Sequence, residues 1–216
     1  MSIRVILADD HTLVRQSLAD TINEELGMEV VGQAEDGMQV VDLVKEQAPD
    51  VVLMDINMPR QNGIDATREI MRHRPETRVV ALSMVSSSRF VNEMFNAGAT
   101  GYLLKDCDSE ELYEAIRKVA EGEQYISAGI PGITQTDLDQ SRPEKQDSAF
   151  SILTKRQRQV VQLLAEGKST KQVALCMHLS PKTIEAHRLG AMRKLGLDTI
   201  AGLTKYAVQE GLTSLE

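Results

Sequence analysis

Three aspartates directly follow two short apolar runs of the chain. The apolar residues 5–8 lead into Asp9 and Asp10, and the apolar residues 51–54 lead into Asp55. Apolar runs of this length, bounded by polar residues, are typical of buried strands in a parallel sheet. In open sheets of this kind, ligands bind at the carboxyl ends of the strands, where the strand order reverses. If the two strands are neighbours, three carboxylates meet in one crevice.

Carboxylates that lie this close raise one another's pKa unless a cation neutralises them. Mg²⁺ is the expected ion, because it binds a few carboxylate oxygens, keeps several waters and bridges to phosphate. The crevice therefore predicts metal-assisted phosphoryl transfer. The alternative is that the aspartates end strands and cap helices. That role explains one aspartate, but not Asp9 and Asp10 together with Asp55.

The elements around these residues alternate between strand and helix patterns over residues 1–121. Asp108 and Glu111 have the spacing of an N-cap and its reciprocal partner at the last helix. Five such units predict an α/β fold, a doubly wound five-stranded parallel sheet with helices on both faces. The expected strands are 4–8, 30–34, 51–55, 79–83 and 102–104, and the expected helices are 12–25, 36–48, 62–74, 87–97 and 109–121.

The rest of the chain lacks the alternating strand and helix patterns of residues 1–121. Residues 122–149 contain Gly and Pro followed by a polar stretch without apolar periodicity, which predicts a linker. Residues 150–216 predict four short helices and no strand. Thr154 and Ser169 each precede a Gln by three residues, which is the capping-box spacing. Pro181 opens the third helix and Gly196 follows it, so the segment predicts a small all-α helix-turn-helix domain.

Composition separates the two domains by charge. Residues 1–121 hold 12 Lys and Arg against 22 Asp and Glu, a net of −10, whereas residues 150–216 hold 10 against 5, a net of +5. The basic domain is therefore the part expected to meet a polyanion. Cys107 and Cys176 match no metal-ligand spacing and are expected to be reduced thiols. We find no membrane-spanning run and no leader, and we expect a cytoplasmic protein.

Residues 1–121 resemble the flavodoxin-like receiver domain of bacterial two-component response regulators. The matching positions are the pair Asp9 and Asp10, then Asp55, Ser83 and Lys105, each at the carboxyl end of a predicted strand. The resemblance implies that Asp55 accepts a phosphoryl group from a phosphohistidine of a sensor histidine kinase. It also implies that Lys105 and Ser83 bind phosphoryl oxygens, whose growing negative charge needs such donors.

The resemblance further implies how the metal is held. Asp10 and Asp55 are expected to coordinate Mg²⁺ directly with the backbone carbonyl of Asn57, and Asp9 to act through a bound water. Tyr102 resembles the switch aromatic of the family and is expected to turn inward when Ser83 moves toward the phosphoryl group. A half-buried core tyrosine is the alternative for Tyr102, and we expect His11 and His73 to be ordinary surface residues.

Residues 153–211 resemble the LuxR-type helix-turn-helix of the NarL/FixJ subfamily. Thr170 to Leu189 matches the motif proper, and Pro181 to Leu195 the recognition helix. Gln157 and Gln159 stand where the family commonly has Glu, which puts an intradomain ion pair in question. Basic residues are expected at phosphates and the middle of the recognition helix at base edges. The expected contacts are Lys171, Lys182, Thr183, Glu185, Ala186, His187, Arg188, Leu189, Arg193 and Lys194.

These features predict a phosphorylation-gated transcription factor that binds promoter DNA as a homodimer and acts on RNA polymerase. It is expected not to be an enzyme beyond self-phosphorylation and slow dephosphorylation. One alternative is a Mg-dependent phosphatase with an aspartyl-phosphate intermediate, but such enzymes usually carry a second Asp where this chain has Asn57. The other alternative is a regulator that senses a small molecule or needs no phosphorylation. The charged crevice and the scarcity of aromatic residues argue against an apolar ligand pocket.

Overall fold

The computed structural model describes residues 2–84, 86–130 and 148–213. The chain divides into two compact units, which are described separately: a unit built on a sheet and a C-terminal helical unit. Most of the polar stretch predicted to be a linker, residues 131–147, lies outside the described residues. Among the described residues, no helix has the length and apolar character needed to cross a bilayer.

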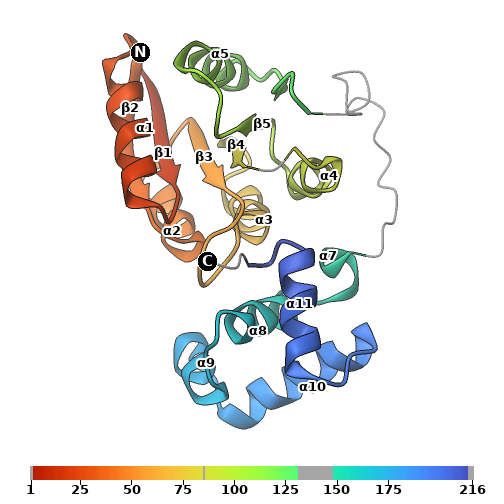
Figure 1. Cartoon of the computed structure of the whole chain (residues 1–216). Helices are drawn as coiled ribbons and strands as arrows, with labels where there is room; N and C mark the ends of the chain where they lie inside the picture. Colours follow the sequence, from red (N-terminus) through yellow and green to blue (C-terminus); the bar gives the residue numbers. More distant parts are fainter. Residues whose placement is uncertain (1, 85, 131–147, 214–216) are drawn as a thin grey trace. The chain divides into compact units, whose positions relative to one another are not determined.

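The first unit contains one fully parallel sheet with the strand order β2-β1-β3-β4-β5-β6 (Figure 1). The prediction of five strands is wrong in one respect, because a sixth strand, β6 (Tyr125–Ile126), pairs with β5 inside the expected linker. Two residues are too short to produce an apolar pattern. The five predicted strands are present as β1 (Ile3–Ala8), β2 (Met28–Ala34), β3 (Val51–Asp55), β4 (Arg78–Ser83) and β5 (Gly101–Leu104).

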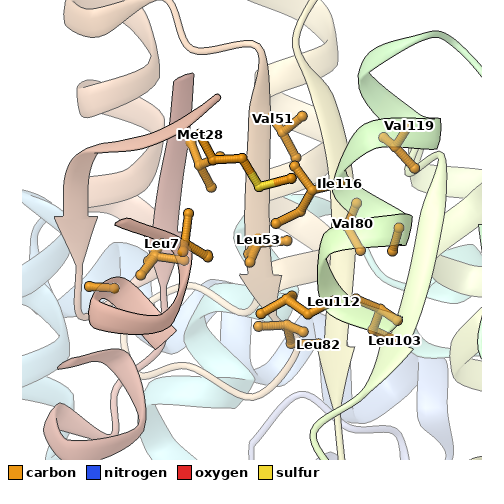
Figure 2. Close-up of a cluster of buried hydrophobic side chains, with 14 residues drawn as sticks. Leu7, Met28, Val51, Leu53, Val80, Leu82, Leu103, Leu112, Ile116 and Val119 are labelled. Atoms are coloured by element: carbon orange, nitrogen blue, oxygen red, sulfur yellow. The ribbon is translucent and has the colours of Figure 1, made fainter. Parts of the chain in front are cut away.

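One face of the sheet is covered by α1 (Thr12–Glu24) and α5 (Ser109–Ala120). Their apolar side chains meet those of the central strands in one buried cluster, and Figure 2 shows Leu53 of β3 close to Leu112 and Ile116 of α5. The cluster is aliphatic, as the composition requires. It holds the carboxyl ends of β1, β3, β4 and β5 side by side.

The intervening residues of the same strands are buried as well. Ile6, Val52 and Met54 are almost completely inaccessible. Three further helices pack along the strands, so the doubly wound architecture is confirmed. These helices are α2 (Gly37–Gln47), α3 (Gly63–His73) and α4 (Ser88–Ala97).

The second unit is entirely helical in its described residues. Helix α8 contacts each of α9, α10 and α11, and their apolar side chains share one core. The prediction of four helices missed a fifth, the one-turn helix α7, which is too short to give a helical period. The helices are α7 (Ala149–Ile152), α8 (Lys155–Ala165), α9 (Thr170–Met177), α10 (Pro181–Leu195) and α11 (Ile200–Gln209).

Helix ends were largely readable from the sequence. Both predicted capping boxes are present, at Thr154 with Gln157 and at Ser169 with Gln172. The pair predicted at α5 is half right, because Asp108 accepts from the backbone N–H of Glu111 at 2.8 Å while the Glu111 carboxylate bonds elsewhere.

Leu53→Ala tests the aliphatic core. Leu53 is fully buried, so truncation removes apolar burial and leaves a cavity, and the free energy of unfolding of the first unit is expected to fall by about 2–5 kcal/mol. Urea unfolding measures this change. Leu26→Ala is the matched control, because Leu26 is 94% exposed and its loss is expected to change stability by less than about 0.5 kcal/mol. Equal losses in the two variants would contradict the assigned packing.

Candidate functional site

The acidic pair, Asp55, Ser83 and Lys105 come together at one edge of the sheet. Asp9 follows β1, Asp55 ends β3, Ser83 ends β4 and Lys105 follows β5, and these four strands are adjacent in the order β1-β3-β4-β5. Asp9, Asp55 and Ser83 are buried. The edge is also where the strand order reverses between β1 and β3, as the sequence predicted.

Lys105 forms ion pairs with two of the three carboxylates. Its Nζ lies 2.7 Å from Asp9 Oδ2 and 2.7 Å from Asp55 Oδ2, with the lysine side chain only 9% exposed. Its backbone N–H donates to the Ser83 carbonyl at 2.9 Å, which fixes the end of β5 against the end of β4. An ammonium buried this deeply needs such partners, because an unpaired buried charge is costly.

His11 lies at the surface, as expected, but it also belongs to the same cluster, so the expectation that it has no partner there was wrong. The imidazole Nδ1 lies 3.1 Å from Asp9 Oδ1 and 3.0 Å from Asp10 Oδ1, although the side chain is largely exposed. The His11 backbone N–H also donates to Asp9 Oδ1 at 2.8 Å. The available signal was position alone, since His11 directly follows the two aspartates in the sequence.

The pKa values record how crowded the site is. Burial raises the pKa of Asp55 to about 6; Lys105 opposes this rise and Asp9 adds to it. Burial also raises the pKa of Asp10, with His11 opposing and Asp9 reinforcing. Burial lowers the pKa of Lys105, but the nearby Asp55 and Asp9 outweigh it and leave the value above its usual level. The site therefore holds more negative charge than its own cations compensate.

This arrangement fits a metal ion with oxygen ligands. Candidate ligand atoms of Asp9, Asp10, His11 and Asp55 all lie within 4.8 Å of one another. Among the described residues, the buried Oδ1 of Asn57, two positions after Asp55, has no hydrogen-bond partner. Hard divalent cations choose carboxylate and carbonyl oxygens of this kind. The site is an acidic pocket able to hold such a cation.

Helix α3 approaches Asp55 closely because a glycine begins it. A Cβ on Gly63 would lie 2.1 Å from the backbone oxygen of Asp55, which the backbone could not accommodate without moving. The Gly63 N–H donates to the Ile56 carbonyl at 2.8 Å, and the Asn57 N–H donates to Asp55 Oδ1 at 3.2 Å. These two hydrogen bonds fix the loop after β3 next to the Asp55 carboxylate. The sequence did not predict the close approach of Gly63.

Tyr102 lies inward in this structure. Its side chain is fully buried, and its hydroxyl shares a hydrogen bond with Ser83. Burial raises the pKa of Tyr102 to about 12, so the phenol stays neutral. The ring thus has the inward position that we expected of it, with the Ser83 hydroxyl as the partner of the phenol.

Helix α10 presents a continuous exposed face. The predicted contact residues Lys182, Ala186, Leu189 and Arg193 are all exposed and recur at helical spacing, so they share one side. Ile184 and Ala191 lie buried against the domain core. The remaining predicted contacts on this helix, Thr183, Glu185, His187 and Arg188, are half-buried flanks of that face, and Lys171 is exposed on α9.

Two predicted DNA contacts already have partners within the domain. Arg188 forms an ion pair with Glu185 one turn away, so two residues that are expected to contact bases are paired with each other in this structure. The Lys194 ammonium donates to the Ile152 carbonyl at 3.1 Å and to Gln157 Oε1 at 3.0 Å. At Gln157, where the family commonly has Glu, Lys194 therefore forms a hydrogen bond and not an ion pair. Lys194 therefore also links α10 to the rest of the domain, and its contact with DNA stays a prediction.

Comparison with known proteins agrees with both halves of this description. Residues 5–117 match the response regulator receiver domain, and residues 151–207 match the bacterial regulatory proteins of the luxR family. A sheet with this acidic edge, followed by this helical unit, therefore defines a receiver-containing DNA-binding regulator.

The chain is 35% identical over 210 residues to the response regulator GacA of Pseudomonas aeruginosa, covering 97% of each protein. It is 35% identical over 214 residues to the response regulator UvrY of Escherichia coli, covering 99% of this chain and 97% of UvrY. A LuxR-family response regulator from Aurantimonas sp. SI85-9A1 superposes with a TM-score of 0.58 at 35% identity, covering 60% of this chain and 93% of that one. The chain belongs to the two-component response regulators with a LuxR-type DNA-binding domain.

Asp55→Asn tests the electrostatic state of the pocket. Because the pKa of Asp55 in the folded protein is about 6, above its usual 3.8, protonated Asp55 favours folding below about pH 4, and this benefit is lost as the pH rises through 6. The stability of the variant minus that of the wild type is therefore expected to grow by about 3 kcal/mol between about pH 4 and pH 7.5.

Urea unfolding in EDTA across this pH range gives the measurement. Asp20→Asn, which removes an exposed carboxylate on α1, serves as the matched control. A pH-independent difference for Asp55→Asn would show that the pocket does not disfavour the ionised carboxylate.

Proposed function

We propose that Asp55 is the phosphoacceptor and that its phosphorylation by a sensor histidine kinase controls the binding of the C-terminal domain to promoter DNA. The observation that carries this proposal is the buried Asp55 carboxylate, held 2.7 Å from the Lys105 ammonium among further acidic side chains. Such a pocket disfavours its own negative charge until a cation enters. It then has the donors that a transferred phosphoryl group requires.

In the proposed reaction, an Asp55 carboxylate oxygen forms a bond to phosphorus as the phosphorus–nitrogen bond of the donor phosphohistidine breaks. The electron pair of that bond stays on the departing imidazole nitrogen. In this proposal Lys105, already 2.7 Å from Asp55, and the Ser83 hydroxyl, at the end of the adjacent strand β4, donate to phosphoryl oxygens. Mg²⁺ bound by Asp10, Asp55 and the Asn57 carbonyl, with Asp9 acting through water, would supply positive charge for the same oxygens.

We propose that the protein is a signal carrier and not a multiple-turnover phosphatase. The position two residues after Asp55 is occupied by Asn57, whose amide cannot act as a general acid or base. The aspartyl phosphate then lacks a carboxyl group at that position to activate water. Slow loss of the phosphoryl group suits a protein whose phosphorylated state must last long enough to act on DNA.

An apolar groove beside the site supports a protein as the phosphoryl donor. A cavity of about 420 Å³ lies between α1 and the start of α5, with Lys105 among its lining residues. Leu13 on its rim is 81% exposed, and Val14 beside it is partly exposed. The helix of a kinase that carries the phosphohistidine has apolar surface to pack against there, next to the acceptor.

The exposed face of α10 and the +5 net charge of residues 150–216 support promoter DNA as the second partner. We propose that the phosphorylated protein binds two half-sites as a homodimer in the cytoplasm and that it acts on RNA polymerase. Two copies of one helix-turn-helix give the matching half-site spacing of about one helical turn.

The acceptor is tested by incubating the full chain with acetyl phosphate and Mg²⁺. Wild type is expected to gain one acid-labile phosphoryl group and to bind selected DNA more tightly. Asp55→Ala is expected to do neither, because it lacks the accepting oxygen. Intact-mass spectrometry and DNA selection with and without the donor are the two measurements. Donor-enhanced binding that survives Asp55→Ala would defeat the proposal.

The DNA surface is tested on the selected sequence. Lys182→Ala is expected to weaken binding to all sequences and to reduce the salt slope by about 1, since it removes one phosphate contact. Arg188→Ala is expected to cost about 1–3 kcal/mol at the preferred site and to relax the choice of base. Lys205→Ala, an exposed lysine on α11, is the control and should leave the slope unchanged. Equal effects of all three would point to non-specific charge.

A further inference from the structure

The segment after α5 returns to the sheet before the chain continues to the second domain. The Tyr125 N–H donates to the Thr100 carbonyl at 3.1 Å, and the Ser127 N–H donates to the Tyr102 carbonyl at 3.0 Å. Through β6, the first residues of the interdomain connection are thus hydrogen-bonded along the outer edge of β5. This attachment lies opposite β4, which carries Ser83 on the other side of β5.

The side chain of Ser127 completes the attachment at the end of β5. Its hydroxyl accepts from the Leu104 N–H at 3.2 Å and donates to Glu111 Oε1 at 2.7 Å. Ser127 is only 4% exposed, so water cannot readily replace either bond. Glu111 also hydrogen-bonds to the Tyr125 hydroxyl, and the Lys118 ammonium lies 5.5 Å from the centre of the Tyr125 ring. The segment is held by both α5 and β5.

These bonds end next to the phosphoacceptor site. Leu104, whose N–H is held by Ser127, directly precedes Lys105, whose ammonium bridges Asp9 and Asp55. Tyr102, whose carbonyl accepts from Ser127, shares a side-chain hydrogen bond with Ser83. Ser127 is therefore hydrogen-bonded to the backbone of Leu104, which precedes Lys105. It is also hydrogen-bonded to the backbone of Tyr102, the partner of Ser83.

We propose that Ser127 is a positioning residue that couples Lys105 to the start of the interdomain connection. A phosphoryl group on Asp55 gives Lys105 a new anionic partner, and any shift of the β5 end changes the Leu104 and Tyr102 bonds to Ser127. Coupling of this kind is reciprocal, so the state of Ser127 also influences the phosphorylated site. The inference rests on the proposed phosphorylation of Asp55.

The test compares full-length wild type, Ser127→Ala and Ser127→Thr, with Ser109→Ala as a control on the exposed first turn of α5. Hydrogen exchange of peptides covering residues 101–105 and 122–130 is followed with Mg²⁺, before and after addition of beryllofluoride as a phosphoryl mimic. The lifetime of the acetyl-phosphate adduct is followed by intact mass.

In wild type, beryllofluoride is expected to change the exchange of residues 122–130. Ser127→Ala is expected to exchange about tenfold faster there without the mimic, because both buried hydrogen bonds of the hydroxyl are lost, and to lose the response to the mimic. Its adduct lifetime should change several-fold. Ser127→Thr retains the hydroxyl and should behave as wild type, as should Ser109→Ala. If Ser127→Ala does not fold, Glu111→Gln weakens the same bond and is expected to reduce the response.

The outcomes separate the two proposals. No adduct on wild type overturns the phosphorylation of Asp55, and the inference falls with it. A normal adduct with no change at residues 122–130 overturns the inference alone. So does a Ser127→Ala variant that is less stable but keeps the wild-type response and adduct lifetime, because Ser127 is then merely structural.

Discussion

The structure depends on one buried interaction, the ammonium of Lys105 placed between the carboxylates of Asp9 and Asp55. One positive charge does not balance this site, and burial together with the neighbouring acids keeps the pKa of Asp55 near 6. The imbalance leaves an acidic pocket able to hold a divalent cation. In our proposal, that cation and Lys105 together offset the charge of a further anion. A fully neutralised pocket would be more stable and less receptive.

The buried apolar core offsets the unfavourable free energy of crowding these charges together. The strands that carry the charged residues are buried on both faces, and their apolar side chains are aliphatic and closely packed. Backbone bonds of the parallel sheet fix the strand ends, so the carboxylates cannot move apart. Gly63 lets the start of α3 lie against the backbone of Asp55, where any side chain would collide with the Asp55 carbonyl. The packed strands thus provide the stability of the first unit, and the acidic site lies at their carboxyl ends.

Much of this was predictable because it depends on local pattern. Apolar runs that end in Asp9 and Asp55, and caps such as Thr154 with Gln157, follow from residue type and spacing alone. The features that were missed depend on contacts across the fold. Strand β6 exists because the edge of β5 offers it hydrogen bonds, and His11 joins the acidic group because the chain turns there. Likewise Lys194 is held by Gln157 from another helix, which no spacing rule reveals.

A switch of this kind requires a difference in free energy between two states, not simply an added charge. A shift from almost all inactive to almost all active needs about 5.5 kcal/mol of differential stabilisation. In the proposed reaction, the Asp55 carboxylate becomes an acyl phosphate that carries up to about two negative charges, which strengthens its attraction to Lys105. That gain reaches the DNA-binding domain only if the position of β5 matters beyond the sheet. We propose that the hydrogen bonds from β5 to Ser127 provide such a connection, because the backbone that precedes Lys105 also holds the start of the chain leaving the domain.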